Sequence, residues 1–137
     1  MKKCNFQMMI KYIIQQKAVD YELPKSVRKY NRTSDKIHKE FSKINFEDNE
    51  EIIEFKALLN HEEAVVRIFA AEWLIIKVKM NRDELNYCVG ILVDSIDEMP
   101  DENKFVERFW LHQWQEGNIT FAMNKWETGD AGLSSLS

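Results

Sequence analysis

The feature that most constrains this fold is an almost uninterrupted apolar segment that begins near Glu62 and ends near Val78. Its apolar residues cover most of a helix circumference, which is typical of a helix that is buried on nearly all sides. We therefore expect a central helix against which the other elements pack. Its apolar members are Val65, Val66, Ile68, Phe69, Ala70, Ala71, Trp73, Leu74, Ile75, Ile76 and Val78.

The rest of the chain repeats apolar residues every three or four positions, the spacing of one helix face. No segment alternates with a period of two, and the whole chain has only four Gly and two Pro, so the sequence predicts helices and no strands. Asn49, Asn81 or Asp83, and Asp101 are the expected N-caps, and Gly117 is expected to end a helix. The expected helices run from Cys4 to Lys17, through Tyr30 to about Asn45 after an interruption at Pro24, from Asn49 to Asn60, from Asn81 or Asp83 to Pro100, from Asp101 to Gly117, and from Ile119 to Trp126.

The length of 137 residues is that of one ordinary domain, with 45% hydrophobic residues to build a core. We expect a single helical domain over residues 1–129 and a flexible tail over 130–137. Charge is divided unevenly, since residues 1–45 carry eleven Lys/Arg and four Asp/Glu, whereas residues 46–137 carry eight and nineteen. Such a division bears on partners and association rates rather than on the fold.

The segment from Leu58 to Leu74 resembles the turn and inner helix of a HEAT-type repeat: an acidic turn, an inward Val, the following Arg67, and paired Ala residues that permit close helix approach. Together with Asn31–Phe41 and Ala122–Gly129, it resembles a family of short bacterial HEAT-like proteins of no assigned activity, over roughly residues 18 to 129. An aromatic-rich helix between Met99 and Gly117 departs from that pattern. The resemblance implies an all-α fold, a right-handed α-α superhelix of about six to seven helices.

Members of this family look like proteins encoded beside bacterial toxins, which implies an immunity function. The resemblance thus points to a protein that binds a cognate toxin and neutralises it by stoichiometric occlusion. A basic nuclease domain, as in contact-dependent growth inhibition, is the kind of toxin that an acidic surface would bind. The sequence shows no signal peptide and no apolar run of about 20 residues, so we expect a cytoplasmic location and no membrane partner.

The sequence offers no pattern typical of catalysis, cofactor binding or a metal site. His38, His61 and His112 have no partner at ligand spacing, and the glycines never cluster into a phosphate-binding loop. Cys4 and Cys88 lie in apolar-periodic surroundings and predict buried free thiols rather than a disulfide or a metal site. We expect a binding protein without catalytic residues, cofactor or metal.

Two acidic rows and two tryptophans are the candidate contact residues. Each acidic row is either a solvated helix face or a docking surface for a basic partner, and each tryptophan is either core or an exposed anchor. The candidate partner-binding residues are Glu50, Glu51, Glu54, Tyr87, Asp94, Asp97, Glu98, Trp110 and Trp114.

Two alternatives remain open. The basic first third of the chain is a candidate for binding nucleic acid, as in HEAT-like DNA glycosylases, although its Lys residues are spread out and the repeat-like helices are acidic where phosphate contacts need Lys or Arg. A general protein-binding scaffold is the other alternative.

Overall fold

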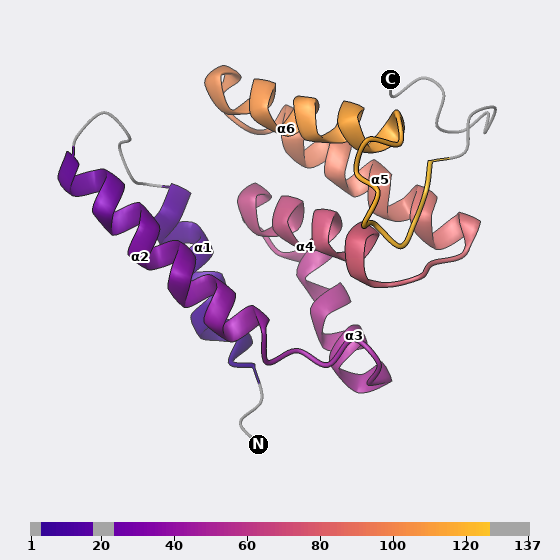
Figure 1. Ribbon diagram of the computed structural model, residues 1–137, viewed down its shortest axis with the longest axis horizontal. Helices are drawn as coiled ribbons and strands as arrows, with labels where there is room; N and C mark the ends of the chain where they lie inside the picture. The colour runs from indigo at the N-terminus through magenta and orange to yellow at the C-terminus, as the bar shows by residue number, and fades with distance from the viewer. Residues whose placement is uncertain (1–3, 18–23, 127–137) are drawn as a thin grey trace. The chain divides into compact units, whose positions relative to one another are not determined.

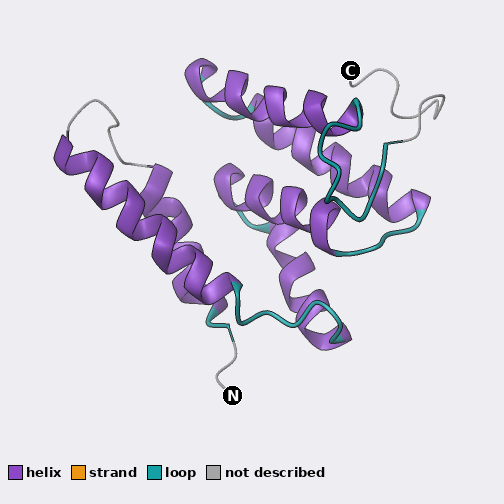
Figure 2. Ribbon diagram, in the orientation of Figure 1, coloured by secondary structure: helices purple, strands orange, loops and turns teal. Residues whose placement is uncertain are grey.

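The computed structural model describes residues 4–17 and 24–126, and every regular element in them is a helix (Figure 1 and Figure 2). Within these residues the prediction of an all-α protein without strands is confirmed. No helix of the described part is long and apolar enough to cross a membrane. The elements are α1 (Phe6–Lys17), α2 (Pro24–Phe41), α3 (Asn49–Lys56), the 3-10 helix η1 (Ala57–Asn60), α4 (Ala64–Lys77), α5 (Arg82–Asp97) and α6 (Asp101–Gln115).

Contacts divide the chain into two compact units, the N-terminal unit (Met1–Phe55) and the C-terminal unit (Lys56–Ser137). The single domain over residues 1–129 stays a prediction, and the expected tail lies outside the described residues. The N-terminal unit has eleven Lys/Arg against nine Asp/Glu, and the C-terminal unit has eight against fourteen. The excess of negative charge therefore belongs to the C-terminal unit, with a net charge of −6 against +2.

In the N-terminal unit, α1 and α2 lie side by side as an antiparallel hairpin (Figure 1). Met9 and Ile13 on α1 and Ile37 on α2 are buried. A cluster of phenylalanines joins this hairpin to α3, and Phe55 at its centre is fully buried, with ring centroids 5.5 to 6.4 Å apart. The cluster consists of Phe6, Phe41, Phe46 and Phe55.

In the C-terminal unit, α4 packs along α5, and α5 packs against α6. Ala70 and Ala71 have no exposed surface, and the small side chains let α5 come close enough for the Cys88 thiol to donate to the Ala71 carbonyl at 3.5 Å. The prediction that α4 is the most buried helix is confirmed. Its buried residues are Ala64, Val66, Ile68, Ala70, Ala71, Leu74, Ile75 and Ile76.

The second helix differs from the prediction at its end. Pro24, where an interruption between the first two helices was expected, is the first residue of α2, because a proline at the first helical position loses no hydrogen bond. The helix ends at Phe41, short of Asn45, because the backbone bonds after Ser42 reach back only three residues, from Lys43 to Glu40 and from Ile44 to Phe41. Such bonds tighten the chain into a turn.

The expected N-caps are confirmed at Asn81, whose side chain accepts from the Glu84 amide at 2.8 Å, and are wrong by one residue elsewhere. Asn49 and Asp101 are the first helical residues of α3 and α6. The carboxylate of Asp48 takes the capping role for α3 by accepting from the Glu50 amide at 2.9 Å. Gly117 ends α6 as expected, with a positive φ of 81°.

The expected helix from Ile119 to Trp126 is wrong, because this segment forms turns. Two of its backbone amides bond to the end of α4 instead of forming a helix: the Met123 amide donates to the Ile76 carbonyl at 2.9 Å and the Asn124 amide to the Ile75 carbonyl at 3.3 Å. The last carbonyls of a helix have no partner within it, so the segment satisfies them and gives up its own helix.

Candidate functional site

The acidic row on α5 lies on the solvent side of the C-terminal unit. Tyr87 is 55% exposed, and Asp94, Asp97 and Glu98 are exposed as well. Positions 87, 94 and 98 share one helix face, opposite the buried Leu92 and Ile96 side, as the sequence predicted. We call Tyr87, Asp94, Asp97 and Glu98 the α5 acidic face.

Two of these carboxylates are partly neutralised by arginines from other helices. Asp97 pairs with Arg108 at 3.3 Å, and Glu98 pairs with Arg67. Arg67 is itself held in place, because its Nε donates to Ser95 Oγ at 2.9 Å and its Nη1 to the His61 carbonyl at 2.7 Å. Asp94 makes no ion pair within the described part of the chain, so its charge is the one most available to a partner.

The acidic row on α3 belongs to the N-terminal unit. Glu50 and Glu54 are exposed and share their face with Ile53, which is 67% exposed, while Glu51 is half-buried. The pKa of the buried Cys4 thiol is raised to about 12, first by burial and then by the carboxylate of Glu40. The carboxylates of Glu54 and Glu51 on α3 add to this increase. The structure thus groups the three α3 carboxylates together and the four α5 residues together, each in its own unit.

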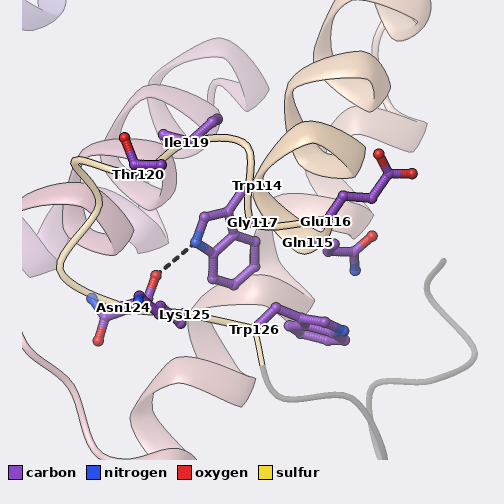
Figure 3. Close-up of a pocket in the computed structure, with 9 residues that line it drawn as sticks. All are labelled: Trp114, Gln115, Glu116, Gly117, Ile119, Thr120, Asn124, Lys125 and Trp126. Atoms are coloured by element: carbon purple, nitrogen blue, oxygen red, sulfur yellow. Dashed lines mark hydrogen bonds between the residues drawn. The ribbon is translucent and has the colours of Figure 1, made fainter.

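Trp114 is core, so its assignment as a surface anchor is wrong. It is 2% exposed, its indole N–H donates to the Asn124 carbonyl at 2.7 Å, and its ring meets Trp126 edge to face at 5.5 Å (Figure 3). A buried indole requires such a partner for its N–H. Trp110 is half-buried and stacks on Trp114 with centroids 6.4 Å apart, so most of its contact surface is already used.

A cavity of about 230 Å³ lies between the end of α6 and the segment that follows it (Figure 3). Trp114, Gln115, Lys125 and Trp126 are among its lining residues. The amide atoms of Gln115 are buried and make no hydrogen bond with described residues. The volume is below the ~300 Å³ typical of small-molecule sites, so we assign this cavity to packing.

Sequence reasoning noted the excess of apolar residues on α6 but missed which of them form its exposed aromatic face, because it chose Trp110 and Trp114 as the candidate anchors. Phe105 is 75% exposed, Val106 63% and Phe109 58%, although aromatic side chains of this size are usually buried. A groove of about 360 Å³ runs along the same face. The available signal was that the apolar residues of this helix cover more circumference than one packing face needs, which requires some of them to point outward. The groove is lined by Asp101, Lys104, Phe105, Arg108, Phe109 and His112.

A pair of carboxyl groups on the inner face of α6 was also missed. Glu72 on α4 and Glu107 on α6 are half-buried, and their carboxyl groups lie close enough to interact. Burial, and then the charge of Glu107, raise the pKa of Glu72 well above its usual value of 4.5. Neither residue lines the two cavities above, so the pair has no evident access to a substrate.

The remaining polar candidates have structural partners. Cys4 and Cys88 are free and buried, as predicted. His61 lies just before α4, where its Nδ1 accepts from the Glu63 amide at 3.0 Å. In the described ranges no three His, Cys, Asp or Glu side chains gather as metal ligands.

The basic third of the chain uses part of its charge internally. Lys36 Nζ lies 5.4 Å from the centre of the Tyr12 ring, and Lys43 pairs with Glu40 at 3.0 Å. These contacts fit a solvated helix face better than a row of phosphate-binding lysines.

No protein-family model, curated protein or solved structure matches this chain. Function is therefore argued from the surfaces described above.

Proposed function

We propose that this protein is an immunity protein, a cytoplasmic binding protein without enzymatic activity that neutralises a cognate bacterial toxin by stoichiometric occlusion. In this proposal its helices form a HEAT-like right-handed α-α superhelix. The observation that carries the proposal is the α5 acidic face, an exposed row of carboxylates around an exposed tyrosine in a unit of net charge −6.

The chemistry of this face suits a basic partner. From Tyr87 to Glu98 the row extends about 16 Å along the helix, at a rise of about 1.5 Å per residue. Its charge speeds the encounter with a surface rich in Lys and Arg, such as the substrate-binding surface of a nuclease domain. Tyr87 supplies what charge alone does not, because a rigid, half-exposed aromatic ring buries a large area at a small entropy cost.

The decisive experiment is binding to the toxin-like protein encoded by the neighbouring gene. The informative variant is Tyr87→Ala combined with Asp94→Lys, because both side chains are exposed and Asp94 makes no ion pair within the described residues. We expect it to weaken binding by about 100-fold, the size of a hot-spot loss, and to abolish protection of cells against the toxin. Asp97 and Glu98 are left unchanged because their reversal would place two positive charges beside Arg108 and Arg67.

Asp35→Lys is the matched control. Asp35 is exposed on α2 in the N-terminal unit, and its reversal changes the net charge by the same amount as Asp94→Lys. We expect its affinity to stay within about twofold of the wild type. Absence of binding by the wild-type protein contradicts the function, whereas wild-type affinity of the double variant contradicts only the choice of surface.

A further inference from the structure

We propose that the outer face of α6 is the contact surface of a homodimer, in which α6 packs antiparallel against α6 of a second copy. We call its residues the α6 seam: Asp101, Lys104, Phe105, Arg108, Phe109 and His112. This inference does not depend on the identity of the partner bound by the α5 acidic face.

The α6 seam has the pattern of a helix-packing surface. Its positions recur at intervals of three and four residues, as in a stripe that faces another helix. Its phenylalanines lie on the side of α6 opposite Trp114, which is 2% exposed and packs into the core. Phe105 and Phe109 are four residues apart and 75% and 58% exposed, and neighbouring exposed aromatic side chains of this kind often mark an interaction site.

The charges of the seam favour a second copy over a strongly charged partner. Asp101 pairs with Lys104 at 3.4 Å, and Arg108 pairs with Asp97 at 3.3 Å, so the seam is close to neutral within an acidic unit. Two acidic chains therefore repel each other less at this face than at the α5 acidic face. A basic partner, by contrast, has little electrostatic reason to choose the seam.

The order of the charges selects the antiparallel arrangement. A two-fold axis near the middle of the seam places Asp101 opposite His112 of the second copy. The same axis places Lys104 opposite Phe109 and Arg108 opposite Phe105, where a cation over an aromatic ring is attractive. A parallel arrangement would instead set Asp101 against Asp101 and Arg108 against Arg108.

The exposed area indicates a weak dimer. A phenylalanine buries about 150–250 Å² when covered, so Phe105 and Phe109 together offer roughly 270 Å² for each chain at their exposed fractions. Stable interfaces bury about 800 Å² for each partner, so we expect a dissociation constant on the order of 100 μM.

Sedimentation equilibrium over roughly 1 μM to 1 mM tests the dimer. We expect the average mass to rise from 16.3 kDa towards twice that value at the upper end. Phe105→Ser with Phe109→Ser should leave a folded monomer throughout, and Phe121→Ser should dimerise like the wild type, because Phe121 is 70% exposed but outside the seam. A wild-type chain that stays monomeric at 1 mM overturns the proposal, as does a dimer that survives the double variant.

Disulfide trapping tests the register independently. We expect a mixture of Asp101→Cys and His112→Cys chains to form a disulfide-linked heterodimer, while neither variant links to itself, because the two positions meet only across an antiparallel pair. Burial raises the pKa of the native Cys4 and Cys88 thiols to about 12, so they should not compete. Linkage of Asp101→Cys to itself, or no linkage in the mixture, overturns the antiparallel arrangement.

Discussion

Asn124 holds three parts of the C-terminal unit together, and its replacement by alanine should destabilise that unit strongly. The side chain is 2% exposed. Its amide donates to the carbonyls of Ile75 at 2.7 Å and Val78 at 2.6 Å, and its Oδ1 accepts from the Met80 amide at 2.9 Å. Asn124→Ala therefore removes the side-chain bonds that connect the last segment to the end of α4 and to the loop before α5, and leaves only the backbone bonds of Met123 and Asn124.

The expected loss follows from these bonds. Three hydrogen bonds contribute about 0.5–1.5 kcal/mol each, and at least one buried group left without a partner adds about 1–3 kcal/mol, so we expect a loss of at least about 2.5 kcal/mol. Asn124→Asp keeps the acceptor but points a carboxylate at two carbonyl oxygens, which raises its folded pKa above the unfolded value. Relative to Asn124→Ala, this variant should therefore gain stability as the pH falls.

Urea unfolding followed by tryptophan fluorescence is the appropriate measurement. All four tryptophans lie in the C-terminal unit, so the signal reports the unit that contains Asn124. Asn118→Ala is the matched control, because Asn118 is exposed and its amide donates to Gln113 Oε1 at 3.0 Å. We expect this control to change stability by less than about 0.5 kcal/mol.

Two results would refute the reasoning. One is a loss below about 1 kcal/mol for Asn124→Ala, which would mean that water replaces the amide at little cost. The other is an equal loss for Asn118→Ala, which would mean that burial of the hydrogen bonds is not what makes Asn124 important.

Two further predictions concern charged residues of the same unit. Because the pKa of Glu72 is raised in the folded protein, the contribution of Glu72 to stability falls as the pH rises above about 4.5. Glu72→Gln should therefore reduce the pH dependence of the free energy of unfolding between pH 5 and 8. An unchanged pH dependence would contradict the carboxyl pair. Arg67→Lys should cost about 2–3 kcal/mol in urea unfolding, because an ammonium cannot bond Ser95, the His61 carbonyl and Glu98 together; a loss equal to that of the exposed Arg108→Lys would argue against this role.

Features that depend on neighbours in the sequence were predictable. The buried circumference of α4 followed from its apolar composition, and the Asn81 cap from a bond that reaches only three residues ahead. The exposure of Tyr87 and Asp94 followed in the same way from the apolar stripe on the other side of α5.

Features that depend on distant residues were not predictable. The segment from Ile119 to Trp126 has a helical pattern, but the carbonyls at the end of α4 take its amides. The ion pairs of Asp97 and Glu98 involve arginines on other helices, so the acidic row could be located on α5 but its free charge could not be assigned to Asp94.

The aromatic helix shows most clearly where sequence ends and tertiary structure begins. The sequence by itself determined that α6 is a helix with large apolar side chains on more than one side, because spacing and propensity act locally. Only the tertiary structure decided that Trp114 packs inward and that Phe105 and Phe109 face solvent. A helix with two apolar sides buries the side that packs against neighbouring elements. On the buried side of α6 the indole N–H of Trp114 donates to the Asn124 carbonyl, and Glu107 interacts with Glu72 of α4.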